Sequence, residues 1–452
     1  MRKQLQPWLA KSISSTALLN AKRRLNELKR KVKRQPHLIS VFIRADDPYS
    51  YLLLQVLSEM EERYEAKFSY HVVSRLQEHM YPEPELWHNN ALRDSAHIAE
   101  LYSLNMPLLA QQRSSRETDS ATAQLLQLEA RQDNLGSDSS QRSNFVKEAL
   151  IILERYWAGS AIDTAVDSAL EQALMKNDAL LDSLGHYLSA TLHYGGEWYW
   201  GIDRLAHLEE RLNNLSLNRL SLNDSAQQIK YQQGIQYFCR RLDAVTDFPK
   251  RSDVPLIIFF SARSPYSYLG LERGVALAKH YGIQIIVKPV LPMMMRNMYV
   301  PPRKQWYIFS DTKREARRLG IDYGFVADPL GVGVERCYAL LSYAREHNKD
   351  VEYLLSFARA VNANGVHSDT DQGMKTIVEG AGLNWGDAKP VMQNNLQTQE
   401  WRAEVERNYD EMQALGLWGV PCFQYADLSV WGQDRVDVIE QAICRDIKLI
   451  NA

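Results

Sequence analysis

The chain of 452 residues is 45% apolar and 24% charged, a composition typical of globular proteins with sizeable cores. This length predicts about two or three domains. The four cysteines lie far apart and form neither a Cys-x-x-Cys motif nor a zinc-binding pattern, so we expect no disulfide framework and no metal site. The apolar runs are too short to span a bilayer and no segment resembles a cleavable signal peptide, so we expect a cytoplasmic protein.

Residues 1–36 form a basic arm. They contain 11 of the 53 lysines and arginines and a single acidic residue, Glu27, in a chain whose formal net charge is −2. Four apolar residues of the arm share one helical face: Leu18, Leu25, Leu28 and Val32. This stripe can pack on the protein's own body, or the arm can make peripheral contact with an anionic membrane. Because the remaining chain has 42 basic and 54 acidic residues, we expect no nucleic-acid partner.

Residues 37–220 are predicted to form the first of two α/β domains. Its predicted elements, in chain order, are a strand at 38–43, a helix at 48–63, a strand at 67–73, helical material at 78–181 that includes a low-hydrophobicity segment at 111–143 expected to be partly loop, strands at 187–193 and 198–200, and a helix at 204–215. A linker at 221–253 follows, in which 222–247 have helical spacing.

Residues 254–452 are predicted to form the second domain, with the same order of elements. They are a strand at 255–260, a helix at 265–281, a strand at 283–290, helical material at 302–415, strands at 422–425 and 428–431, and a helix at 435–447. A βαβ unit, a helical insertion and a closing ββα unit predict, in each half, a four-stranded thioredoxin-like sheet with an all-helical subdomain.

The two halves also repeat each other in sequence. Adding 217 to residues 39–64 aligns them without a gap with residues 256–281, and nine of the aligned residues are identical. Adding 231 aligns Trp200-Gly201-Ile202-Asp203-Arg204 with Trp431-Gly432-Gln433-Asp434-Arg435. A repeat of roughly 200 residues is far longer than a solenoid unit. It predicts tandem duplicated domains, which we expect to pack as an intramolecular pseudo-dimer.

The tetrapeptide Ser264-Pro265-Tyr266-Ser267 follows the first strand of the second half, where a thioredoxin-like protein carries Cys-x-x-Cys. Pro265 suits the first helical position, and Ser264 before it is a natural N-cap. Exchange of protein disulfides requires an attacking sulfur and a resolving sulfur, and this motif has neither. The motif therefore argues against a protein disulfide oxidoreductase.

The second half resembles the DsbA-related branch that contains kappa-class glutathione transferases and 2-hydroxychromene-2-carboxylate isomerases. The matching pieces are Ser264-Pro265-Tyr266-Ser267-Tyr268-Leu269-Gly270, Pro302-Arg303-Lys304 with Tyr307 and Asp311, Gly419-Val420-Pro421, and Trp431-Gly432-Gln433-Asp434-Arg435-Val436. The resemblance implies that glutathione is a cosubstrate and supplies the missing thiol. It also implies a small apolar electrophile as the substrate.

On this resemblance Ser264 is the catalytic residue. Its hydroxyl can donate to the glutathione sulfur at a helix N-terminus, which favours the thiolate; the alternative is that Ser264 only caps its helix. Val420 is expected to present its backbone to the cysteinyl part of glutathione. Pro421 resembles a cis-proline, with an ordinary edge-strand proline as the alternative. Cys422 is expected to pack as a small hydrophobic residue.

Three further residues are expected to hold the two ends of glutathione. Gln433 and Asp434 open the last helix, where N–H groups can bind the γ-glutamyl carboxylate. Asp434 can pair with the ammonium group of the ligand or with Arg435. Lys304 matches a basic position that can contact the glycine end, and an ordinary surface lysine is the alternative. Four methionines after the second strand can fill the core or line a pocket: Met293, Met294, Met295 and Met298.

The first half departs from the family at the positions expected to bind glutathione, because Asp47 and Ala190 stand where the second half has Ser264 and Pro421. A carboxylate about 4 Å from a thiolate costs roughly 4 kcal/mol at an effective dielectric of about 20. We therefore expect the first half not to activate glutathione. Two functions follow from the sequence: a glutathione-dependent isomerase or transferase whose chemistry is confined to the second half, or a non-catalytic binding or scaffold protein.

Overall fold

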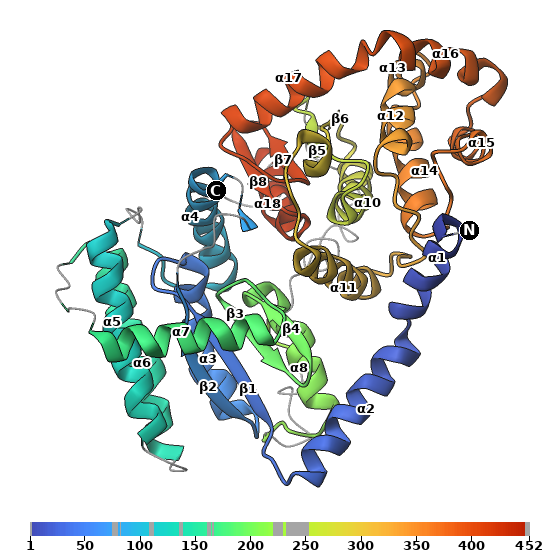
Figure 1. Cartoon of the computed structure of the whole chain (residues 1–452). Helices are drawn as coiled ribbons and strands as arrows, with labels where there is room; N and C mark the ends of the chain where they lie inside the picture. Colours follow the sequence, from blue (N-terminus) through green and yellow to red (C-terminus); the bar gives the residue numbers. More distant parts are fainter. Residues whose placement is uncertain are drawn as a thin grey trace. The chain divides into compact units, whose positions relative to one another are not determined.

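The computed structural model describes residues 2–74, 80–81, 83–107, 113–134, 139–160, 164, 167–219, 229–231 and 253–447. Two compact units make up the protein (Figure 1). One consists of Asn20–Gln233, and the other joins Met1–Leu19 to Gly234–Ala452. Apart from residues 229–231, the helix predicted at 222–247 lies outside the described residues.

The C-terminal unit is built on a four-stranded sheet of order β6-β5-β7-β8. Its strands are β5 (Leu256–Phe260), β6 (Ile285–Pro289), β7 (Cys422–Tyr425) and β8 (Leu428–Trp431). The β5–β6 pair is parallel, and the β5–β7 and β7–β8 pairs are antiparallel. The four predicted strands are therefore present, with β6 shorter than predicted.

The two faces of this sheet bury alternate residues of the same strands. Phe259 of β5 and Cys422 of β7 pack in a core cluster with Met412 of α17 (Trp401–Ala414). Their neighbours in the chain, Ile258 and Phe423, point to the other face of the sheet, because successive side chains of a strand alternate between its two faces. On that face they contact α10 (Pro265–Tyr281). The helix lies close to the sheet at Gly274, where an added Cβ would lie 2.6 Å from Ile258 Cδ1.

The helical insertion of this unit runs between β6 and β7. It comprises η4 (Met293–Arg296), α11 (Pro302–Leu319), α12 (Val332–Ala339), α13 (Leu341–Glu346), α14 (Asp350–Asn362), α15 (Asp371–Gly380), α16 (Trp385–Thr398) and α17. After β8 the chain forms η5 (Gln433–Arg435) and α18 (Val436–Asp446). This arrangement confirms the βαβ, helical insertion and ββα order predicted for the second half.

The N-terminal unit contains a sheet of the same strand order, β2-β1-β3-β4. Its strands are β1 (Leu38–Ile43), β2 (Lys67–Val72), β3 (Thr191–Tyr194) and β4 (Glu197–Trp200). Ile39 pairs with Phe68 and Tyr194, and its counterpart Leu256 pairs with Ile285 and Tyr425. The register is thus the same in the two sheets after the offsets of 217 and 231.

The helices of the N-terminal unit are α3 (Pro48–Arg63), α4 (Pro84–Tyr102), α5 (Ser115–Asn134), α6 (Ser139–Trp157), α7 (Ser168–Ser183), η2 (Ile202–Arg204) and α8 (Leu205–Asn214). The segment at 111–143, expected to be partly loop, is helical over most of its described length, because α5 occupies it. Ser114 and Glu117 form a capping box: the Glu117 N–H donates to Ser114 Oγ (3.3 Å), and the Ser114 N–H donates to Glu117 Oε2 (3.0 Å). Behind this cap, α5 buries Ala121, Leu125 and Leu128 at helical spacing.

The basic arm forms two helices, α1 (Arg2–Ile13) and α2 (Thr16–Val32). Trp8 of α1 makes an edge contact with Phe325, with 5.0 Å between the ring centroids, so α1 packs within the C-terminal unit. None of the described residues of α2 is buried, and the interpretation that its leucine stripe packs on the protein's own body was wrong. Among the described helices, none is both long and apolar enough to cross a membrane.

Candidate functional site

Ser264 lies at the junction between β5 and α10. It has extended backbone angles and caps α10, because its Oγ accepts from the Ser267 N–H at 3.2 Å and Pro265 takes the first helical turn. Ser267 itself is buried, and its Oγ accepts from the Ser261 N–H at 3.3 Å. Of the two serines in the motif, Ser267 therefore supports the strand–helix junction, while Ser264 remains half-exposed at the helix N-terminus.

Val420 supplies the second side of this junction. The Ser264 hydroxyl donates to the Val420 carbonyl oxygen at 3.4 Å, which is long for a bond between two oxygens. The Val420–Pro421 peptide bond is cis, which confirms the cis-proline prediction. Because the Ser264 hydroxyl is held only weakly, it can turn to a better acceptor placed beside the helix N-terminus.

Pro421 is held against the same helix that Ser264 caps. A Cβ added at Gly270 of α10 would lie 2.9 Å from Pro421 Cγ, so only glycine permits this approach. The next residue, Cys422, is fully buried in the core cluster, and its Sγ lies 2.7 Å from the Gly419 carbonyl oxygen. The prediction that Cys422 packs as a small hydrophobic residue is confirmed.

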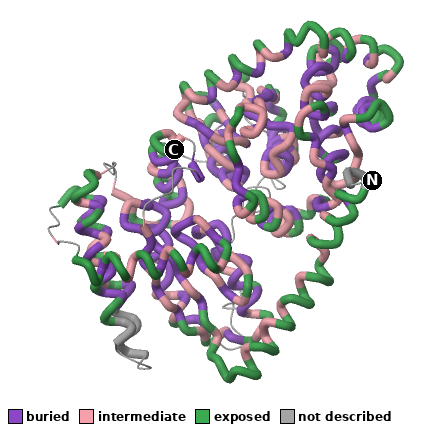
Figure 2. Tube along the Cα trace, in the orientation of Figure 1, coloured by how far each residue is buried: buried purple, intermediate pink, exposed green. Residues whose placement is uncertain are grey.

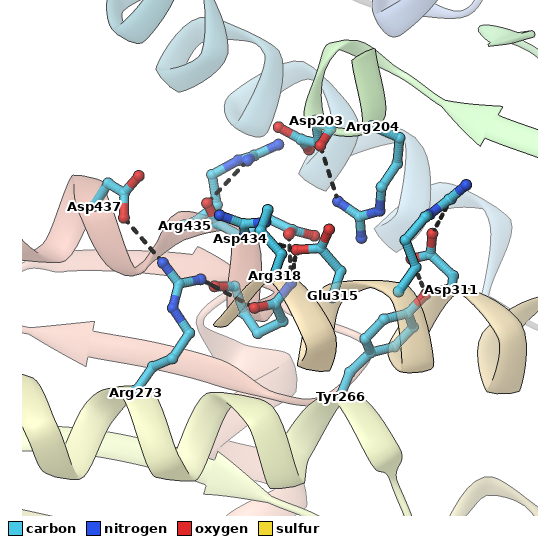
Figure 3. Close-up of polar contacts among 12 residues, drawn as sticks. Asp203, Arg204, Tyr266, Arg273, Asp311, Glu315, Arg318, Asp434, Arg435 and Asp437 are labelled. Carbon is cyan, nitrogen blue, oxygen red and sulfur yellow. Dashed lines mark hydrogen bonds and ion pairs between the residues drawn. The ribbon is translucent and has the colours of Figure 1, made fainter. Parts of the chain in front are cut away.

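Helix α11 is tied to the start of α10 by a hydrogen bond between side chains. The Tyr266 hydroxyl donates to Asp311 Oδ2 at 2.7 Å (Figure 3), and Asp311 Oδ1 pairs with Arg314 at 2.5 Å. Both Tyr266 and Asp311 belong to the pieces that carried the sequence resemblance. Their bond fixes the helix that carries Lys304 relative to the Ser264 N-cap.

Lys304 is buried, with 8% of its surface exposed, so the interpretation as an ordinary surface lysine was wrong. Its Nζ lies 5.3 Å from the centroid of the Trp418 ring, within the range of a cation–π contact. Burial lowers the pKa of Lys304 to about 8, because a charged ammonium is poorly solvated there. Trp418 stands two residues before Val420, which brings Lys304 to the segment that faces Ser264.

Gln433 is engaged within the domain. It is 1% exposed, its Oε1 accepts from Arg273 Nη1 at 3.0 Å, and its Nε2 donates to Asp434 Oδ1 at 2.5 Å. Arg273 also donates to Asp437 Oδ1 at 3.1 Å (Figure 3). Arg435 Nη1 donates to the Asp434 carbonyl oxygen at 3.2 Å.

The structure thus joins Ser264 and Val420 directly and ties Gln433 and Asp434 to the same helix through Arg273. Arg273 follows Ser264 by nine residues, or about 13 Å along the helix axis. The sequence reasoning missed Arg273, Asp437 and Trp418, because they are distant in sequence from their partners and no local motif marks them.

The methionine segment after β6 lies at the surface rather than in the core. Each of the four predicted methionines is half-buried, and η4 contains no buried residue, so core filling was the wrong interpretation. Met294 contacts Arg263, whose Nη1 is 3.1 Å from the thioether sulfur, and Arg263 forms a two-bond pair with Asp328.

The corresponding junction in the first half is closed around Asp47. This residue is 1% exposed and caps α3: its Oδ1 accepts from the Tyr49 N–H at 3.1 Å. Its Oδ2 accepts from the hydroxyls of Ser189 at 2.6 Å and Ser50 at 3.0 Å. Burial raises the pKa of Asp47, and the Arg44 guanidinium partly offsets this. Ala190, at the position of Pro421, has a positive φ of 52°.

Comparisons with known proteins identify the domain that carries Ser264. Residues 255–444 match the family model of the DSBA-like thioredoxin domain. The C-terminal half is a DsbA-like thioredoxin domain. A curated relative, 2-hydroxychromene-2-carboxylate isomerase from Pseudomonas putida, is 24% identical over 199 residues, which cover 41% of this chain and 93% of the relative.

Two solved structures also resemble this DsbA-like domain's fold. A 2-hydroxychromene-2-carboxylate isomerase structure is 22% identical, covers 44% of this chain and 99% of its own, and has a TM-score of 0.38. A probable DsbA oxidoreductase from Streptomyces coelicolor is 20% identical, covers 44% of this chain and 92% of its own, and has a TM-score of 0.35.

Proposed function

We propose that the C-terminal DsbA-like domain binds glutathione and stabilises its thiolate, and that the thiolate acts on a small apolar electrophile. The observation that carries the proposal is the half-buried Ser264 side chain at the α10 N-terminus: its oxygen caps the helix, and its hydroxyl hydrogen has a long contact of 3.4 Å to the Val420 carbonyl oxygen. A helix N-terminus and a hydroxyl donor both favour an anion at this point. The similarity to a 2-hydroxychromene-2-carboxylate isomerase supports isomerisation as the reaction class.

The remaining residues are proposed to position the tripeptide. Val420 offers its backbone to the cysteinyl part, beside the cis peptide bond to Pro421. The N-terminal turn at Gln433 and Asp434 takes the γ-glutamyl group, with the Asp434 carboxylate facing its ammonium. Lys304, buried and close to Trp418, takes the glycine carboxylate as a charge-assisted pair.

The proposed chemistry begins with addition of the thiolate to an unsaturated carbonyl compound. The sulfur forms a bond to the electron-poor carbon, and the displaced electron pair moves to the carbonyl oxygen. In an isomerase the single bond so created rotates, the electron pair returns, and the thiolate leaves unchanged. In a transferase the adduct takes up a proton and stays attached. The half-buried methionines near Arg263 offer an adaptable apolar surface to such a substrate.

Isothermal titration calorimetry, in which glutathione is titrated into the full-length protein, tests this proposal. We expect binding in the wild type and, with an unsaturated carbonyl substrate, turnover that falls about 10- to 1000-fold in Ser264→Ala, as typically follows the loss of one stabilising donor. Asp47→Ala, the matched change in the first half, should leave both quantities unchanged. Lack of binding at millimolar glutathione contradicts the proposal and favours a non-catalytic binding or scaffold protein.

We further propose that the first half is a duplicated domain that has lost thiolate chemistry. Its sheet has the strand order and register of the C-terminal sheet, which supports the duplication. The buried Asp47 carboxylate opposes a second anion at this junction. Packing of the two halves as a pseudo-dimer stays a prediction.

A further inference from the structure

Helix α2 is attached to the N-terminal unit by its polar face. Arg23 forms two hydrogen bonds with the Glu197 carboxylate, at 2.7 and 2.8 Å, and Asn26 Nδ2 donates to the Gly195 carbonyl oxygen at 2.7 Å. Gly195 lies in the turn between β3 and β4, and Glu197 is the first residue of β4. Gly196 has a positive φ of 83°, which favours glycine, and a Cβ built there would lie 2.9 Å from Asn26 Nδ2, so the Asn26 side chain would have to shift.

The opposite face of α2 is apolar and exposed. The exposed fractions are 36% for Leu18, 50% for Leu25, 59% for Leu28 and 75% for Val32. At 3.6 residues per turn, the centre of this stripe lies about 150° around the helix axis from the face of Arg23, Asn26 and Arg30. Figure 2 shows the described part of α2 as exposed or intermediate throughout. The helix thus reverses the usual orientation, in which the apolar stripe faces the core.

The charges around the exposed stripe have one sign. Lys22 and Lys29 border it on one side and Arg24 and Lys31 on the other, and all four residues are exposed. The single acid of the arm, Glu27, lies on the attached side and pairs with Arg30 at 2.5 Å. The outward face therefore combines four apolar side chains with flanking cations and no carboxylate.

We propose that this face of α2, defined by Leu18, Leu25, Leu28 and Val32, binds the surface of an anionic lipid bilayer. The apolar side chains enter the boundary between headgroups and acyl chains, and the long basic side chains on both flanks extend to the lipid phosphates. A surface that carries only cations is complementary to anionic lipids. A nucleic acid would use the cations but leave the leucine stripe without a partner. A second copy of the chain would bring two positively charged faces together, and these would repel each other.

The test uses the full-length protein and vesicles of phosphatidylcholine with or without phosphatidylserine, separated by flotation. We expect binding to the vesicles that contain phosphatidylserine, weakened by salt because the cations contribute. Leu25→Ser with Leu28→Ser should reduce this binding at least tenfold. Lys22→Gln with Lys29→Gln should reduce it about fivefold for each charge removed.

Ile151→Ser on α6 is the matched control, because Ile151 is 57% exposed, as Leu28 is 59% exposed. This control should bind the vesicles as the wild type does, and circular dichroism should show that the exposed substitutions leave the fold intact. No binding to anionic vesicles at low salt, or undiminished binding of the double leucine variant, overturns the proposal. The proposal is also overturned if this face mediates self-association or nucleic-acid binding and the protein does not bind the vesicles.

Discussion

Ser264 and Asp47 occupy the same point in two sheets of the same strand order, and their hydrogen-bond partners differ. The Ser264 hydroxyl accepts from the Ser267 N–H at 3.2 Å, donates to the Val420 carbonyl oxygen only over a long distance of 3.4 Å, and is half-buried. The Asp47 carboxylate accepts three hydrogen bonds of 3.1 Å or less and is 1% exposed. One N-cap is available to a ligand, and the other already has its full complement of partners.

The framework around the two N-caps has changed far less. Three hydrogen bonds occur at matching positions in both halves. The bond from Tyr49 to Asp94 corresponds to that from Tyr266 to Asp311, and the bond from the Arg44 N–H to Ser50 corresponds to that from the Ser261 N–H to Ser267. The bond from the Gly201 N–H to the Ala190 carbonyl oxygen corresponds to that from the Gly432 N–H to the Pro421 carbonyl oxygen. Each pair obeys the offsets of 217 and 231. Trp87, by contrast, is the buried residue at the position of Lys304. The comparison teaches that the polar scaffold of the fold persists while the residues proposed to meet the ligand have been replaced.

A buried tyrosine–glutamate pair is also repeated, with different support in each half. Tyr64 donates to Glu209 at 3.4 Å, and Glu209 pairs with Arg63 at 2.8 Å. Tyr281 donates to Glu440 at 2.9 Å. Burial raises the pKa of Glu440 to about 7, so this carboxyl is protonated below neutral pH in the folded protein.

The largest expected effect comes from Glu209→Gln. The substitution leaves the 7% exposed Arg63 guanidinium without its carboxylate, which typically costs about 3–5 kcal/mol of unfolding free energy. Because burial raises the pKa of Glu209, we expect chemical denaturation of the full-length protein to show this loss most fully at pH 8. A loss below about 1 kcal/mol contradicts the assigned pair.

Glu440→Gln should act differently, through the pH dependence of stability. Because the pKa of Glu440 is raised, its protonated form stabilises the fold fully below the ordinary value near 4.5, and this contribution is lost as pH rises through about 7. The loss amounts to about 3 kcal/mol for a shift of this size. Glutamine is neutral at every pH, so the unfolding free energy of the variant should equal that of the wild type near pH 5 and exceed it at pH 8. Parallel stability curves would refute the assignment.

Lys304→Met should weaken the binding of S-methylglutathione about tenfold at pH 7, as expected for the loss of one charge-assisted contact. This probe has no thiol, so only the ends of the tripeptide titrate with the protein. Since the pKa of Lys304 is lowered to about 8, its positive charge is lost as pH rises from 7 to 9. The ammonium group of the probe titrates in the same range, so the affinity of both proteins should fall, and that of the wild type should fall more steeply than that of the variant. Calorimetry at three pH values decides between them.

The smallest expected effect is that of Asp47→Ala. Loss of the N-cap acceptor should lower the unfolding free energy by about 1 kcal/mol, measured by denaturant titration. Asp47→Asn keeps an acceptor and should recover about half of the loss. Destabilisation of several kcal/mol by the alanine variant would mean that the hydrogen bonds from Ser189 and Ser50 to Asp47 contribute more than the helix cap does.

Local signals predicted the parts of this molecule that local physics determines. The bounds of α10 follow from Ser264 and Pro265 at its start and Gly282 at its end, and those of β7 and β8 follow from alternation. The capping box before α5 was readable in the sequence but was overlooked. The contact of Lys304 with Trp418 joins residues 114 positions apart, and no local pattern announces it. The stripe on α2 was found, but its orientation depends on the glycine turn that holds the opposite face.

The ionisation of bound glutathione tests the central claim most directly. Thiolate absorbance is measured against pH for protein with glutathione, relative to protein alone, in the wild type, Ser264→Ala and Asp47→Ala. The wild type and Asp47→Ala should lower the thiol pKa by at least about one unit from the free value near 8.5, and Ser264→Ala should return it toward that value. An equal pKa in the wild type and Ser264→Ala, or a shift abolished by Asp47→Ala, would contradict the assignment of thiolate chemistry to the second half.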